Sequence, residues 1–218
     1  MKVENSDLPQ LNLKDNEVFD HITTAIKSEN TQKIKNLCGN IFFLEKEVGN
    51  TGKSPMELAV SFGKIKSVKA LLEAGIDGKS IKLIGEKTTK LDNEKTVDGL
   101  ELSIMHKKEE AFLFFENQGL DIFKIYSRGN NLLHLCSEND SPKIMELLLK
   151  RGLDPREKNI LGNTPLHTAT LNNHMGCMLT LLDENNPIKS SVNETNNKGT
   201  SSKEMSRMGW LHRTWIKA

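Results

Sequence analysis

Gly162-Asn163-Thr164-Pro165-Leu166-His167-Thr168-Ala169 is the stretch of this sequence that decides the fold. A weaker copy, Asn131-Leu132-Leu133-His134-Leu135-Cys136, stands before it, with His134 at the place of His167. A phrase that recurs at a fixed period of about 20–50 residues is typical of proteins built from stacked structural repeats. The sequence therefore predicts a repeat architecture with a unit of about 33 residues.

A second phrase has the same register. It reads Gly-x-Asp and occurs as Gly75-Ile76-Asp77, Gly119-Leu120-Asp121 and Gly152-Leu153-Asp154. Leucine pairs precede the first and the last of these copies. The second interval equals the period of the first phrase. The first interval is one repeat plus an insertion, and it aligns Ser54-Pro55-Met56-Glu57-Leu58-Ala59 with the first phrase. Two phrases in one register indicate repeats along most of the chain.

Both phrases resemble the Thr-Pro-Leu-His-x-Ala and Leu-Leu-x-x-Gly-x-Asp motifs of the ankyrin repeat. The resemblance implies an all-α solenoid of about five to six units with degenerate caps, each unit a finger loop and two antiparallel helices. We expect a flexible tail at 1–14 and an ankyrin domain at 15–218. Its expected parts are a cap at 15–49, repeats at about 50–95, 96–126, 127–159 and 160–196 with an insertion at 78–95, and a partial C-terminal cap at 197–218.

Composition excludes several classes of partner. The 218 residues carry a formal net charge of +1, so no global basic field favours nucleic acid, and we expect no nucleic-acid partner. No apolar run is long enough for a membrane span, and the N-terminus has no apolar signal core. We therefore expect a cytosolic protein without a membrane partner. Export by a route that needs no N-terminal signal stays open.

Histidines and cysteines are expected to be structural. The resemblance implies that His134 and His167 stabilise a turn by hydrogen bonds. It also implies that Cys136 is a small core residue on the inner face of a first helix. The three cysteines lack any Cys-x-x-Cys spacing, so neither a disulfide framework nor a metal site is indicated. Motifs of phosphate-binding loops, hydrolases and zinc proteases are incomplete or missing. We expect no enzyme activity and no cofactor.

Three features leave alternatives open. Four large side chains in a row, at positions 112–115, cannot all face one core, so we expect at least one to look outward or to shield the insertion. Trp210 and Trp215 are expected to cover the C-terminal end of the core, and a docking site made by the two is the alternative. The Lys-rich insertion at 78–95 is either a solvated loop or a basic lip over the groove.

Candidate partner-binding residues follow from the resemblance. The two residues before the glycine position that follows each first helix normally face the concave groove, and the finger tips add a polar rim. The groove candidates are Phe62, Met105, His106, Glu138, Asn139, Leu171 and Asn172, and the rim candidates are Lys53, Arg128, Asn130, Ile160 and Asn163. Phe62, Met105 and Leu171 are apolar at solvent-facing places, which favours an interaction surface. Scattered surface hydrophobics are the alternative.

The function expected is therefore a non-enzymatic module that binds a partner protein in its groove as a monomer. A secreted effector that acts on host proteins in the host cytosol is one form of this hypothesis. The substrate-docking subunit of a multi-chain enzyme or ubiquitin ligase is an alternative. A cytosolic inhibitor of a transcription factor is a third.

Overall fold

A computed structural model describes residues 15–38, 53–83, 96–186 and 188–207. The chain divides into two compact units, residues 1–77 with 82–96, and residues 78–81 with 97–218. The expected tail at 1–14, most of the insertion, and Trp210 and Trp215 lie outside the described residues.

The first unit contains two helix pairs. Helices α1 (Asp15–Lys27) and α2 (Thr31–Cys38) form the first pair, and α3 (Pro55–Ser61) and α4 (Ile65–Glu73) form the second. Within this unit α1 packs on α3 and α2 packs on α4, so first helices and second helices make separate layers. Ile26, Ile34 and Leu71 are fully buried between them. The degenerate first repeat thus contributes apolar side chains as the later repeats do.

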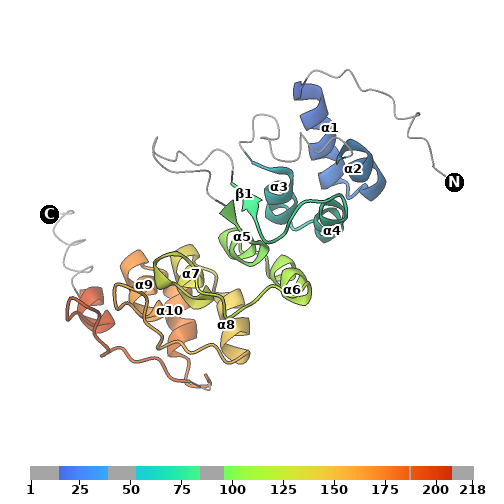
Figure 1. Ribbon diagram of the computed structural model, residues 1–218. Helices are drawn as coiled ribbons and strands as arrows, with labels where there is room; N and C mark the ends of the chain where they lie inside the picture. The colour runs from blue at the N-terminus through green and yellow to red at the C-terminus, as the bar shows by residue number, and fades with distance from the viewer. Residues whose placement is uncertain (1–14, 39–52, 84–95, 187, 208–218) are drawn as a thin grey trace. The chain divides into compact units, whose positions relative to one another are not determined.

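The second unit contains three helix pairs: α5 (Gly99–Met105) with α6 (Glu109–Asn117), α7 (Leu132–Asn139) with α8 (Pro142–Lys150), and α9 (Pro165–Asn172) with α10 (Met175–Leu182). Successive first helices start one full period apart, as the repeating phrase predicts. Helices α5, α7 and α9 pack in one layer, and α6, α8 and α10 in another (Figure 1). An additional helical segment covers 202–207.

Short β and 3-10 elements complete the described fold. Strands β1 (Ile81–Lys82) and β2 (Thr96–Val97) pair at the two ends of the insertion, and a 3-10 turn, η3 (Ser127–Gly129), lies between α6 and α7. A single bridge joins Thr195 and Ser201. These elements are short, so the fold is an all-α solenoid of helix pairs with loops between them.

Each first helix of the second unit begins at a side-chain cap. Asp98, Asn131 and Thr164 accept the backbone N–H three residues later, and Ser201 does the same before the segment 202–207. Such a cap satisfies one of the backbone donors that a helix start leaves open. The four caps therefore fix where helices begin, and they occur at the positions of the repeating phrase.

Neighbouring repeats in the second unit are also joined by polar contacts. The Ser141 hydroxyl donates to the Ile104 carbonyl at 2.8 Å, and one repeat later His174 Nδ1 lies 2.7 Å from the Ser137 carbonyl. Both carbonyls belong to the last turns of first helices, which otherwise leave such acceptors without an intrahelical partner. The side chain that starts a second helix thus completes the hydrogen bonding of the preceding repeat.

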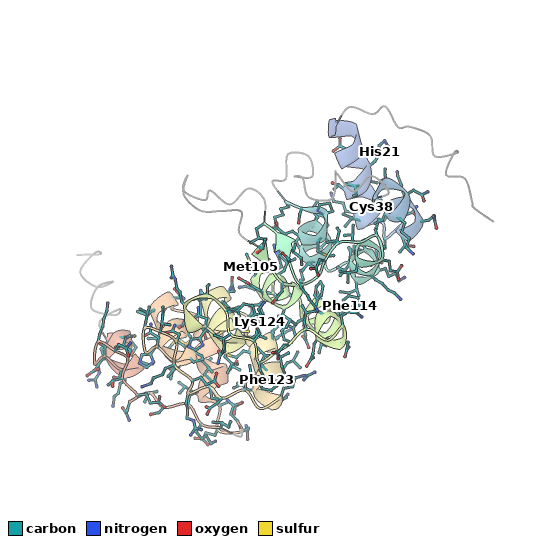
Figure 2. All side chains as sticks on the ribbon, in the orientation of Figure 1. His21, Cys38, Met105, Phe114, Phe123 and Lys124 are labelled. Atoms are coloured by element: carbon teal, nitrogen blue, oxygen red, sulfur yellow. The ribbon has the colours of Figure 1, made fainter. Side chains whose placement is uncertain are left out.

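The aromatic helix α6 divides its large side chains between core and surface. Phe112 and Phe115 are fully buried, whereas Leu113 and Phe114 are partly exposed. Figure 2 labels Phe114 on this helix, and its ring meets the Phe115 ring edge-on at 5.6 Å. The prediction that at least one of the four looks outward is confirmed.

Candidate protein-binding surface

Three finger loops of the second unit have one shared turn geometry. In the tips at 126–129, 159–162 and 196–199, the glycine N–H donates to the carbonyl three residues earlier. Gly129, Gly162 and Gly199 have φ values of 70°, 72° and 71°, which a glycine adopts at no steric cost. We call these three segments together the fingertip row.

Backbone hydrogen bonds connect the tips to one another. Ile160 N–H donates to the Arg128 carbonyl at 3.1 Å, and Asn197 N–H donates to the Leu161 carbonyl at 3.2 Å. The approach is close, since a Cβ placed on Gly162 would lie 2.6 Å from the Asn197 backbone nitrogen. Backbone hydrogen bonds therefore join the three tips of the fingertip row into one continuous surface.

Asparagine side chains form a second connection below the tips. Asn159 donates from Nδ2 to Asn130 Oδ1 at 2.8 Å, and Asn196 makes the equivalent bond to Asn163 Oδ1. Asn130 in turn donates to Glu138 at the end of α7. Asn130 and Asn163 are buried in this ladder. The prediction that these two side chains belong to a solvent-facing rim is wrong, because their amides bind the neighbouring fingers.

The remaining candidates of the second unit differ in exposure. Leu171, at the end of α9, has 60 % of its surface exposed, and Ile160 has 65 %. The side chains of Arg128, Glu138 and Asn172 are exposed, and those of Met105, His106 and Asn139 are partly exposed. Figure 2 labels Met105 at the end of α5. Leu171 and Ile160 are thus the most accessible apolar candidates of this unit.

Two candidates belong to the first unit and have partners there. The Phe62 ring is 41 % exposed, and the Lys27 ammonium lies over it at 5.4 Å from the ring centre. This is the distance of a cation–π contact. Lys53 Nζ lies 3.6 Å from the Glu57 carboxylate. Both residues therefore have roles within the first unit.

Several surface residues of the second unit were missed from the sequence. Leu161 is 52 % exposed beside Ile160, and Lys198 is exposed on the next tip. Phe123 and Ile125 are exposed on the finger before α7, where Figure 2 labels Phe123. An apolar pair at a turn, Ile160-Leu161, was the available signal, because turns usually carry polar residues.

His134 and His167 connect each helix start to the next finger. His167 Nδ1 accepts from the Thr164 N–H and hydroxyl, and its Nε2 donates to the Thr200 carbonyl at 3.2 Å. His134 makes the same bonds to the Asn131 N–H and the Asn163 carbonyl. Burial lowers the pKa of both imidazoles below the ordinary value. The structural role predicted for both residues is confirmed.

These pKa shifts predict acid-dependent loss of stability. An unfolded histidine takes up a proton near pH 6.5, whereas the folded imidazoles resist it until lower pH, so the unfolded state binds more protons below pH 6.5. The free energy of unfolding should therefore be fully present above pH 6.5 and fall as the pH drops through that value. Urea denaturation at a series of pH values checks this. The slope should shrink in a His134→Asn, His167→Asn variant, and an unchanged slope would contradict the assignment.

Cysteines are buried and unpaired. All three thiols are free, and burial raises the pKa of Cys38 and Cys177 to about 12 and that of Cys136 well above the usual value. A thiol with a raised pKa is a poor nucleophile and metal ligand. The expected role of Cys136 as a small core side chain is confirmed. Within the described parts of the chain, no group of three or more potential ligands is placed to hold a metal ion.

The second unit combines helix pairs at a constant period, capped helix starts and linked finger loops, which together point to one repeat family. A family model described as ankyrin repeats, three copies, matches residues 100–199. The chain therefore contains ankyrin repeats over these residues. Its array is also similar to the crystal structure of the human ASB11 ankyrin repeat domain, with 16% identity, a TM-score of 0.59, and coverage of 88% of this chain and 81% of that one.

Sequence relatives of this ankyrin array come from proteins of different kinds. NF-kappa-B inhibitor alpha of Rattus norvegicus is 31% identical over 115 residues, which are 51% of this chain and 36% of that protein. Human transient receptor potential cation channel subfamily A member 1 is 24% identical over 137 residues, 62% of this chain and 11% of the channel. The chain thus spans little more than a third of the first relative and about a tenth of the second.

The family sets the general function. Ankyrin repeats are protein-protein interaction modules, and the fold is generally a non-catalytic scaffold. Among the described residues, no helix combines the length and apolar character needed to cross a membrane.

Proposed function

We propose that the ankyrin array binds a partner protein through its finger tips and the exposed ends of its first helices. The observation that carries this proposal is the exposure of Leu171 on α9 and of Ile160 and Leu161 on the finger before it. Their neighbours in the same repeat, including Leu166 and Ala169, are buried. The fold therefore gains little from these three apolar side chains, whereas a partner could bury them.

The end of α7 adds a polar margin to the proposed surface. Glu138 is exposed and accepts a hydrogen bond from Asn130 at the finger base. The bond connects the last turn of a first helix with the finger of the same repeat. Asn172 and Asn173 lie at the equivalent end of α9, and both are exposed. An apolar centre with a polar margin is the usual composition of a protein interface.

Leu171→Glu tests this proposal. Burying a carboxylate where a partner covers Leu171 should reduce recovery of that partner at least about tenfold, the size expected for an interface anchor. Affinity capture from cell lysate with quantitative mass spectrometry measures the recovery, and a dissociation constant for the recovered protein follows.

Leu179→Glu is the matched control. Leu179 lies on the second helix α10 and is 65 % exposed, close to the exposure of Leu171. The control variant should recover the same partner as the wild type. Equal recovery by the Leu171 variant, with its melting temperature unchanged, would contradict a site at the end of α9.

A cytosolic inhibitor of a transcription factor is a second candidate function. It is favoured by the similarity to NF-kappa-B inhibitor alpha, which extends over half of this chain at 31% identity. Recovery of a DNA-binding protein by the wild type and not by the Leu171 variant would support it. Loss of DNA binding by that protein on addition of the array would be the direct measurement.

A cytosolic location is part of the proposal. Three free, buried cysteines fit a reducing compartment, where disulfides are rare. Delivery into a host cytosol as an effector is compatible with the same observation. Fractionation of cells that carry the tagged chain tests the location.

A further inference from the structure

The geometry points to the fingertip row as a docking site for an acidic protein segment that carries an apolar side chain between its carboxylates. This inference rests on the proposed function and names the chemistry of the partner. Four exposed side chains make the site: Arg128, Ile160, Leu161 and Lys198. They come from three consecutive fingers of the second unit.

The centre of the site is apolar and has a fixed backbone. Ile160 uses its N–H, and Leu161 its carbonyl, to bind the two adjacent fingers. The Asn197 side chain also donates to the Ile160 carbonyl at 3.0 Å. Because these bonds hold the backbone, both side chains are presented from an ordered support. A preorganised apolar pair loses little conformational entropy when a partner covers it.

The two flanks of the site are cationic. The tip positions equivalent to Leu161 hold Arg128 on the preceding finger and Lys198 on the following one. No acidic residue occurs among 126–129, 159–162 and 196–199. Over the described part of the second unit, neither Arg128 nor Lys198 forms an ion pair. Lys124, on the finger of Arg128, pairs with Asp98, and Arg156, on the middle finger, pairs with Asp154. The tip therefore keeps two cations for an external anion.

Carboxylates on both sides of an apolar side chain complement this pattern. Arg128 can bind a carboxylate with two parallel hydrogen bonds, and Lys198 supplies a second point charge. Covering Ile160 and Leu161 removes water from beside both ion pairs, which strengthens them. A nucleic acid would match the cations but would leave the apolar pair without a complementary group, so an acidic protein segment is the better fit.

A random peptide display library selected on the full chain tests the inference. We expect the selected peptides to be enriched in Asp and Glu on both sides of a large apolar residue. A synthetic peptide of the selected sequence should bind at least about tenfold more weakly to an Arg128→Glu, Lys198→Glu variant and to an Ile160→Ser, Leu161→Ser variant. Binding should also weaken as the salt concentration rises.

Matched controls separate the site from general charge effects. A Lys143→Glu, Lys203→Glu variant changes two exposed cations elsewhere on the second unit and gives the same change in net charge. It should bind the peptide as the wild type does. Arg128 has a φ of 61°, and Glu carries the same left-handed strain there, so the charge-reversal variant should keep its melting temperature.

Several outcomes would overturn the inference. They are selected peptides without acidic enrichment, peptides that bind the tip variants as well as the wild type, and a library that yields no binder. Sensitivity to Leu171→Glu alone would overturn this inference and leave the proposed function standing. If every recovered peptide and protein bound the fingertip variants and the Leu171→Glu variant as well as the wild type, this inference and the proposed function would both be overturned.

Discussion

Replacing Phe115 with Ala is expected to lower the free energy of unfolding by about 3–5 kcal/mol, the usual cost of removing a buried aromatic side chain. The ring is fully buried on α6 and packs against Gly99, at the start of α5. A Cβ placed on Gly99 would overlap the ring at Phe115 Cδ1. Urea denaturation of the full chain measures the loss. A loss of less than about 1 kcal/mol would show that the ring does not belong to the packed core of this repeat.

The same contact predicts strong coupling between the two positions. Gly99→Ala alone should cost about 1–3 kcal/mol, because its methyl group would collide with the ring. In the Phe115→Ala background the same change should be neutral or stabilising, since the space is then open and Ala favours a helix over Gly. A double-mutant cycle measures the coupling. Additive costs would contradict the packing.

His134→Ala is the second change with a large expected effect. It should lower the free energy of unfolding by about 2–4 kcal/mol, because it removes one of the two hydrogen bonds of the capping box and leaves a buried N–H without its acceptor. The donor is the backbone of Asn131, and the Asn163 carbonyl also loses one of its donors. Thermal and urea denaturation measure the effect.

His21→Ala is the control for that experiment. His21 is exposed on α1, so its replacement should cost less than about 0.5 kcal/mol, as is usual for surface substitutions. Equal costs for His21→Ala and His134→Ala would show that the buried hydrogen bonds contribute nothing specific.

The sequence was sufficient for the fold because the repeat phrases encode local geometry. Thr164 and His167 recur as Asn131 and His134 one period earlier, and each pair caps a helix. Side chains that act on backbone three residues away can be recognised from spacing alone. The packing of Phe115 on Gly99 could not be predicted in that way. It depends on how close α5 and α6 approach each other.

The candidate surface was predicted less well. Leu171, Ile160 and Arg128 are exposed where the resemblance placed them, and their part in binding stays a prediction. The resemblance predicts Asn130 and Asn163 on the rim, although asparagine recurs at this position from one repeat to the next. A polar residue repeated at the structural period indicates a structural bond, and this recurrence is the signal for the ladder in the sequence. The sequence does not identify Lys198 as a candidate, because its place beside the apolar pair depends on how neighbouring fingers are arranged.

The asparagine ladder also determines where the chain can change length. The interval from the finger residues Tyr126, Asn159 and Asn196 to the next helix cap is the same in every case. The additional residues of the last repeat instead fall between Leu182 and Asn196, before the ladder begins. Each repeat therefore has a part of constant length, from finger to first helix, and a part of variable length, after the second helix. Evolution or an engineer can lengthen this variable part while the proposed binding surface keeps its spacing.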